Sequence, residues 1–156
     1  MTSVATGQAL PAFQASSTHG PVDSSALQGT PFVLYFYPKD NTPGCTTESQ
    51  DFRDLHGQFQ AIGCQIYGIS RDSLKSHENF TDKQSLPFPL ISDPDEALCG
   101  LFAVMKQKNM YGKQVRGIDR STFLIDRRGV LIQEWRGVRV PGHAEEVLQA
   151  ARNLLA

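Results

Sequence analysis

The sequence predicts an α/β fold in which helices flank a central mixed β-sheet. Segment 32–37 is almost entirely apolar, as is typical of a central strand covered on both faces. An apolar stripe over 52–62, with spacings of three, four and three residues, predicts an amphipathic helix. Two apolar segments near the C-terminus, 121–125 and 130–135, flank a polar turn and predict a β-hairpin. We therefore expect parallel and antiparallel strands to share one sheet.

The N-terminal part predicts a β-hairpin extension of this sheet. Residues 11–31 are polar and rich in turn formers, and the segment Ser17–Gly20 is typical of a hairpin turn. Gly29 to Pro31 then lead into the apolar strand 32–37. We expect the extension to precede the central strand in the chain.

The middle of the chain predicts a parallel unit followed by alternating elements. The first helix ends at Gly63, and 64–70 form a second strand, so a right-handed parallel βαβ unit is expected. Residues 74–84 predict a polar helix, and 88–91 a short strand. A further helix is expected from Asp93 through Phe102.

The last third of the chain completes a thioredoxin-like plan. Residues 104–117 have no clear period and predict a loop, either a functional surface loop or a mobile connector. The C-terminal hairpin turns at Asp126–Gly129, and a helix over 143–155 closes the chain. A βαβ half followed by a ββα half is the thioredoxin-like arrangement, and no linker or repeat divides it. We therefore expect residues 1–156 to form a single domain.

Composition and charge exclude several classes of protein. The net charge of −1, without a cluster of Lys and Arg, argues against binding to nucleic acid or an anionic membrane. No apolar run approaches the roughly 20 residues of a membrane span, and the N-terminus lacks a secretory pattern. Three cysteines without paired spacing argue against a disulfide scaffold. Reduced thiols favour a cytoplasmic location.

A cysteine lies where the central strand gives way to the first helix. In the segment 38–45, Thr42 suits the N-cap, Pro43 suits the first helical position, and Cys45 falls in the first turn. The free N–H groups and the dipole of a helix start favour the thiolate over the thiol. The sequence therefore indicates a reactive nucleophile, although a small buried residue at a helix start is the simpler alternative.

The same residues carry a family resemblance. The pattern Pro38-x-x-x-Thr42-x-x-Cys45 resembles the peroxiredoxin signature. The fuller segment 37–48, together with 117–126, resembles the bacterioferritin-comigratory (Q-type) branch, and the likeness runs from about residue 7 to the C-terminus. It implies an AhpC/TSA-type domain and a thiol-dependent peroxidase that needs no cofactor. Hydrogen peroxide and alkyl hydroperoxides are the implied substrates, and thioredoxin or another small thiol is the implied reductant.

The resemblance also implies roles for individual side chains. Cys45 is the peroxidatic nucleophile that becomes a sulfenic acid, and Arg120 is the cation that contacts its sulfur and the peroxide. Thr42 orients the peroxide besides serving as N-cap, and Pro38 shields the sulfur from water. Glu48, one turn beyond the cysteine, orients the arginine. Each residue also has a plain structural alternative. Arg120 could be a solvated side chain and Thr42 a helix cap alone. Pro38 could be a strand terminator, and Glu48 a carboxylate paired with the helix dipole.

Resolution of the sulfenic acid departs from the family pattern. Q-type members often carry a second cysteine where this chain has Gln50 or Thr81. The remaining candidates are Cys64, which we expect to point away from the helix start, and Cys99. Neither is shown to approach Cys45 within the roughly 7 Å that a disulfide requires between Cα atoms. An external thiol is therefore the favoured resolver, and Cys99 after local unfolding is the alternative.

The histidines do not predict a metal site. None shares a short ligand spacing with another histidine or a cysteine, so we expect no metal, and we interpret His56 and His143 as solvated surface residues.

Two rival functions remain open beside a peroxidase. A thiol–disulfide oxidoreductase of the same fold would need Cys-x-x-Cys, but the positions three residues from Cys45 hold Thr42 and Glu48. A peroxide-sensing module starts from the same sulfenic acid, so repeated turnover separates it from an enzyme. We expect a monomer or a weak homodimer.

Overall fold

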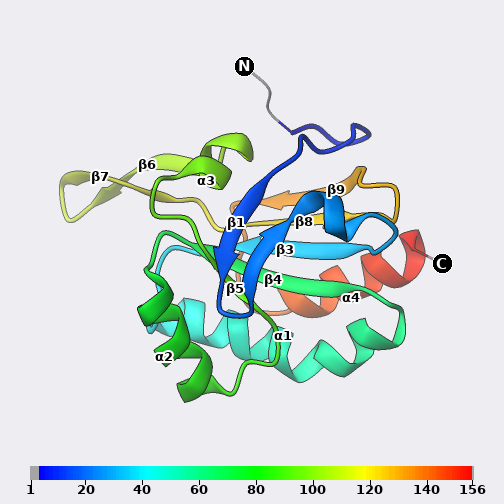
Figure 1. Cartoon of the computed structure of the whole chain (residues 1–156). Coiled ribbons are helices and arrows are strands. Elements are labelled where there is room, and N and C mark those ends of the chain that lie inside the picture. Colours follow the sequence, from blue (N-terminus) through cyan, green and yellow to red (C-terminus); the bar gives the residue numbers. More distant parts are fainter. Residues whose placement is uncertain (1–3, 156) are drawn as a thin grey trace.

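The computed structural model describes residues 4–155 and confirms the α/β prediction (Figure 1). Seven strands form one mixed sheet in the order β2-β1-β5-β4-β3-β8-β9. The strands of this sheet are β1 (Gln14–Ser17), β2 (Gly20–Asp23), β3 (Phe32–Phe36), β4 (Gln65–Ser70), β5 (Leu90–Ser92), β8 (Ser121–Ile125) and β9 (Leu131–Arg136). The helical elements are η1 (Ser24–Leu27), α1 (Pro43–Ala61), α2 (Leu74–Gln84), α3 (Ala97–Leu101) and α4 (His143–Leu154).

The central strand β3 is covered on both sides, as its apolar composition predicted. All five of its residues are buried. It pairs in parallel with β4, to which α1 connects it, and antiparallel with β8. The βαβ unit and the C-terminal hairpin therefore meet at β3. This pairing places the carboxyl end of β3, where α1 begins, beside the start of β8.

Two hydrophobic clusters cover opposite faces of the sheet. Helices α1, α2 and α4 lie on one face, and α3 with the N-terminal segment lies on the other (Figure 1). Cys45 and Phe80 belong to the first cluster, whereas Cys99 and Phe102 belong to the second. The sheet therefore lies between Cys45 and Cys99.

The N-terminal hairpin extends the sheet as expected. Strands β1 and β2 pair antiparallel around the turn after Ser17, and β1 also pairs antiparallel with β5. The Ser17 hydroxyl donates to the carbonyl of Gly20 at 2.6 Å and fixes the turn.

The loop predicted for 104–117 is wrong, because this segment forms a second hairpin. Strands β6 (Met105–Met110) and β7 (Lys113–Ile118) make a separate two-stranded sheet that projects from the body (Figure 1). Tyr111 and Gly112 both adopt positive φ, as a tight two-residue hairpin turn requires. Most of the described side chains of these strands are exposed, and the sequence therefore shows no alternation.

The helix predicted from Asp93 to Phe102 is shorter than expected. It begins only at Ala97, because Glu96 adopts a left-handed conformation with φ of 61°. The Asp93 carboxylate nevertheless caps the helix from a distance, accepting hydrogen bonds from the N–H groups of Leu98 and Cys99. The turn at 93–96 therefore replaces the first helical turn.

The interpretation of His143 as a solvated residue is wrong. Its side chain faces the sheet from the start of α4 and is only 6% exposed. Its Nε2 lies 2.8 Å from the Thr122 hydroxyl, and its ring meets Phe52 and Trp135 edge-on. Burial lowers the pKa of His143 to about 4. His56, in contrast, is half-buried on α1.

We expect His143 to make the protein less stable in acid. Its pKa in the folded state, about 4, lies below the ordinary 6.5, so its contribution is present above pH 6.5 and is lost as the pH falls toward 4. Urea unfolding at about pH 7 and about pH 4.5 should show a loss of roughly 2 kcal/mol that His143→Gln does not show. Equal pH slopes in the two proteins would contradict this prediction.

Candidate active site

Cys45 occupies the first turn of α1. Thr42 is the N-cap by backbone conformation, Pro43 is the first helical residue, and Cys45 is the third. The cysteine side chain is 1% exposed. The predicted position at a helix start is therefore confirmed, and the first N–H groups of this helix have no partner within the helix itself.

Arg120 reaches this sulfur from the other half of the chain. It directly precedes β8, whose pairing sets Ser121 opposite Phe36 at the carboxyl end of β3. Its Nη2 donates to the Cys45 sulfur at 3.5 Å, and its Nη1 donates to Glu48 Oε1 at 2.6 Å. One guanidinium thus bridges two residues that lie one turn apart on α1.

The carboxyl group of Glu48 is almost fully buried. Burial raises the pKa of Glu48 to about 7, although the charge and hydrogen bond of Arg120 act in the opposite direction. Burial acts to lower the pKa of Arg120, but Glu48 and Cys45 outweigh it and raise this pKa above its ordinary value. The guanidinium therefore stays charged beside the sulfur, where a cation stabilises a thiolate.

Gly44 was not identified from the sequence, although it makes room for the arginine. A Cβ atom at this position would lie 3.3 Å from Arg120 Nη2. The absence of a side chain thus lets the guanidinium approach the start of α1. A glycine between the helix-starting proline and the cysteine was the available signal.

Thr42 lies at the predicted place but makes a different contact. Its hydroxyl donates to the carbonyl of Lys39 at 2.7 Å and caps no N–H group of α1. The expected side-chain cap is therefore wrong, because the hydroxyl closes the preceding loop instead. The oxygen keeps its lone pairs for a further partner. Pro38, at the other end of this loop, is half-buried.

A buried polar cluster beneath this loop was missed by the sequence analysis. Asp40 and His77 are 4% and 0% exposed, and the carboxylate and the ring lie 2.8 Å apart. His77 falls three residues before Phe80 on α2, and this position on the apolar side of the helix was the signal. Together with Asp72, these two residues are close enough to hold a metal ion. Their facing atoms are already engaged by hydrogen bonds.

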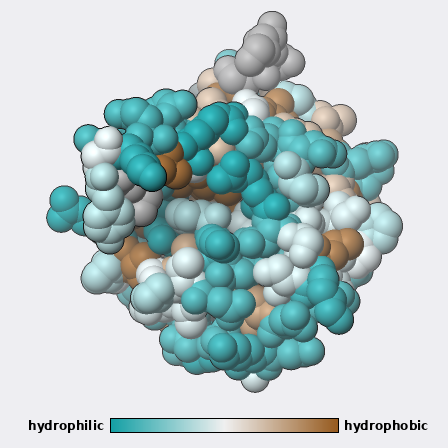
Figure 2. Space-filling model, turned by 90° about the vertical axis from the view of Figure 1, so that its left-hand side faces the viewer, coloured by the Kyte–Doolittle hydropathy of each residue, from teal (hydrophilic) through white to brown (hydrophobic). Residues whose placement is uncertain are grey.

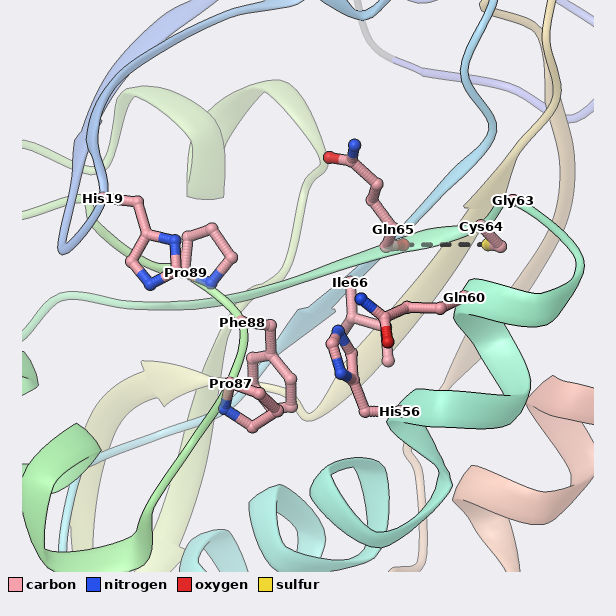
Figure 3. A pocket seen from close by; sticks show the side chains of 10 residues that line it. All are labelled: His19, His56, Gln60, Gly63, Cys64, Gln65, Ile66, Pro87, Phe88 and Pro89. Atoms are coloured by element: carbon pink, nitrogen blue, oxygen red, sulfur yellow. Dashed lines mark hydrogen bonds between the residues drawn. The ribbon is translucent and has the colours of Figure 1, made fainter.

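Cys64 lies at the opposite end of α1 from Cys45. Its N–H donates to the carbonyl of Phe59 near the end of the helix. A helix rises by about 1.5 Å per residue, so Phe59 lies about 20 Å along α1 from Cys45. It lines a cavity of about 380 Å³ with His56 and Phe88, and its sulfur donates to the Gln65 carbonyl (Figure 3). Burial raises the pKa of Cys64 to about 12, so its thiol stays protonated.

Cys99 is separated from Cys45 by the sheet itself. It packs in the cluster on the α3 face, with no exposed side-chain surface. Burial and the neighbouring Asp93 raise the pKa of Cys99 well above its ordinary value. All three cysteines are free thiols. A link between Cys45 and Cys99 would require α3 to leave its place.

The two positions at which the family resemblance would place a second cysteine hold polar side chains. Gln50 donates to Gln84 at 2.8 Å across the gap between α1 and α2. Thr81 is half-buried on α2, and its hydroxyl has no hydrogen-bond partner among the described residues.

The surrounding surface is mainly polar. Figure 2 shows the side of the molecule on which α1 begins and the β6–β7 hairpin projects. This side is largely hydrophilic, with small hydrophobic areas next to a hollow (Figure 2). No helix within residues 4–155 is long and apolar enough to cross a membrane.

Comparison with known proteins identifies the family. The model of the AhpC/TSA family matches residues 6–134. The chain belongs to this family. Peroxiredoxin Bcp of Xanthomonas campestris pv. campestris is 60% identical over 120 residues, which cover 77% of this chain and 75% of the relative. Peroxiredoxin Bcp of Bacillus subtilis is 47% identical over 149 residues, 95% of each chain.

The solved structures agree with the sequence relatives. A structure of the X. campestris bacterioferritin comigratory protein, from work on its alkyl peroxide reduction activity, has a TM-score of 0.88 at 50% identity. The match covers 94% of this chain and 99% of that one. The resemblance to the bacterioferritin-comigratory branch and the thioredoxin-like fold are therefore confirmed. The protein is a thiol-dependent peroxidase, an oxidoreductase that acts on peroxides with a thiol as reductant.

Proposed function

We propose that Cys45 is the peroxidatic nucleophile of this enzyme. Its thiolate attacks one peroxide oxygen, an S–O bond forms, and the O–O bond breaks. The second oxygen leaves with a proton as water or alcohol, and Cys45 becomes a sulfenic acid. The observation that supports this proposal is the bridge from Arg120 to both the Cys45 sulfur and Glu48.

The other residues serve this step by stabilising charge and by positioning the peroxide. Arg120 stabilises the thiolate and the charge that develops on the peroxide oxygens. Glu48 orients Arg120 through their hydrogen bond of 2.6 Å. The hydroxyl of Thr42, with lone pairs still free, orients the peroxide, and Pro38 limits the access of water to the sulfur.

We also propose that an external thiol resolves the sulfenic acid. It attacks the oxidised sulfur and releases water, and a second thiol then breaks the mixed disulfide. The support is spatial: Cys64 lies about 20 Å along α1 from Cys45, and Cys99 lies on the other face of the sheet. Thioredoxin or a small thiol is the proposed donor.

The proposed cycle is tested by repeated turnover. Wild-type protein given excess hydrogen peroxide or an alkyl hydroperoxide, with dithiothreitol or thioredoxin and its reductase, should consume many equivalents of peroxide. Consumption that stops after one equivalent per chain, with the donor still reduced, would instead indicate a peroxide sensor.

Neither remaining cysteine should be required for turnover. We expect Cys64→Ser and Cys99→Ser, singly and together, to keep wild-type rates with dithiothreitol, because neither sulfur reaches Cys45 in the folded protein. Peroxide-consumption assays on the purified variants check this. Loss of thioredoxin-supported activity in Cys99→Ser, with a stoichiometric Cys45–Cys99 disulfide in the wild type, would contradict the proposal.

The setting we propose is a cytoplasmic enzyme of one domain, acting as a monomer or weak homodimer without nucleic-acid or membrane partners. The net charge of −1 and the three free thiols support it.

A further inference from the structure

The loop between β3 and α1 is held at its centre by Asp40. This residue lies midway between Pro38 and Thr42, the two loop residues that the proposed function uses. Its side chain points inward and is buried, whereas the neighbouring Lys39 and Asn41 are exposed. The position of both ends of the loop therefore depends on what Asp40 binds.

Three other elements bind Asp40. The Tyr37 hydroxyl at the end of β3 donates to its Oδ1 at 2.6 Å. The Ser76 hydroxyl on α2 donates to its Oδ2 at 2.7 Å. Its own N–H donates to Asp72 Oδ2, beyond β4, at 2.9 Å. The loop is thus tied to the body of the protein through one buried carboxylate.

His77 is a fourth partner of Asp40. This side chain has no exposed surface, its Nδ1 lies 2.8 Å from Asp40 Oδ2, and its Nε2 lies 2.9 Å from the carbonyl oxygen of Ile91. Both partners are acceptors, and a neutral imidazole has only one N–H to offer. A neutral ring would set a lone pair against one of these oxygens at a fully buried position.

The surroundings favour the charged form of Asp40. Burial acts to raise the pKa of Asp40, but the hydrogen bond and charge of His77, with the hydrogen bonds from Tyr37 and Ser76, outweigh it and hold this pKa below its ordinary value. The other titratable side chains of the cluster are Tyr37, whose hydroxyl lies 3.5 Å from Nδ1, and Asp72. Neither brings a competing positive charge.

We propose that His77 is a positioning residue for the peroxide reaction. As a buried imidazolium it fixes Asp40, and through Asp40 it fixes the loop that presents Pro38 and Thr42 to the peroxide. The inference rests on the proposed roles of those two residues. His77 touches neither the sulfur nor the peroxide, so its effect concerns the approach of the substrate and not the charge on Cys45.

The protonation state is testable in the wild-type protein. Nitrogen-15 NMR of the imidazole side chains should show both His77 ring nitrogens protonated at neutral pH. A spectrum with one protonated and one bare ring nitrogen would overturn the imidazolium. This measurement needs no variant, and it decides the point even if substitutions at position 77 prevent folding.

The positioning role is testable by comparing two reactions of one sulfur. In His77→Asn we expect stopped-flow oxidation of Cys45 by peroxide to slow by about 10²-fold, because small misplacements of reacting groups have effects of that size. Alkylation of Cys45 by iodoacetamide, which does not use the loop, should stay within about threefold of wild type. His56→Asn makes the same substitution at a half-buried position about three turns along α1 from Cys45 and is the matched control, expected within about threefold in both reactions.

The outcomes separate this inference from the proposed function. Wild-type oxidation rates in His77→Asn, or an equal slowing of oxidation and alkylation, would overturn the positioning role. If Cys45→Ser still consumed peroxide, the proposed function itself would fail. Inactive Cys45→Ser together with fast His77→Asn would refute the positioning role alone.

Discussion

Cys45→Ser should abolish the consumption of peroxide. A serine hydroxyl at this position stays protonated at neutral pH and cannot be oxidised to a sulfenic acid, so no residual cycle is expected. Cys45 is 1% exposed, and its sulfur accepts one hydrogen bond from Arg120, which an oxygen can accept in its place. Peroxide consumption with dithiothreitol, measured on purified protein, checks the prediction.

The folded state of this variant is the necessary control. Circular dichroism and urea unfolding should show a native protein of similar stability, because the pair between Arg120 and Glu48 remains. A folded Cys45→Ser variant that kept wild-type turnover would remove Cys45 from the reaction. Cys99→Ser serves as the matched substitution, since it also replaces a buried cysteine and should keep its activity.

Arg120→Ala should slow sulfenic acid formation by about 10²–10³-fold, the usual effect of removing one electrostatic stabiliser from a site with little water. The variant loses the cation beside the sulfur and leaves the buried Glu48 without its partner. Stopped-flow oxidation by hydrogen peroxide measures the rate. Unfolding in urea measures the separate effect on stability.

Two further variants make the arginine experiment specific. Arg116→Ala removes an exposed arginine of the β6–β7 hairpin and should change the rate by no more than about threefold. Thr42→Val removes the hydroxyl that closes the loop onto Lys39 and should also slow oxidation strongly. Rates within about threefold of wild type for both Arg120→Ala and Thr42→Val would leave these residues with structural roles alone.

The sequence predicted those parts of the molecule that depend on strong local patterns. The buried strand β3, the apolar stripe of α1 and the turn after β8 each follow from a period or a turn motif. Cys45 was located because a threonine, a proline and a cysteine agree on one helix start. Arg120 required the family resemblance as well, because an arginine before a strand has no local signature.

Other features depend on contacts between distant segments, which a single sequence does not reveal. Most of the β6–β7 hairpin is exposed, so no alternation of apolar residues marks it. His143 begins α4 in a polar stretch, and its burial follows from the packing of that helix on β8 and β9. The pair of Asp40 and His77 joins residues 37 positions apart.

Intact-mass analysis after one equivalent of hydrogen peroxide tests the central claim most directly. The claim is that the Cys45 thiolate takes one oxygen from the peroxide and waits for an external thiol. The wild-type chain should gain the mass of one oxygen, and a dimedone-type reagent should place it on Cys45. A loss of two hydrogens, or an oxygen found on Cys64 or Cys99 while Cys45 stays reduced, would contradict the account.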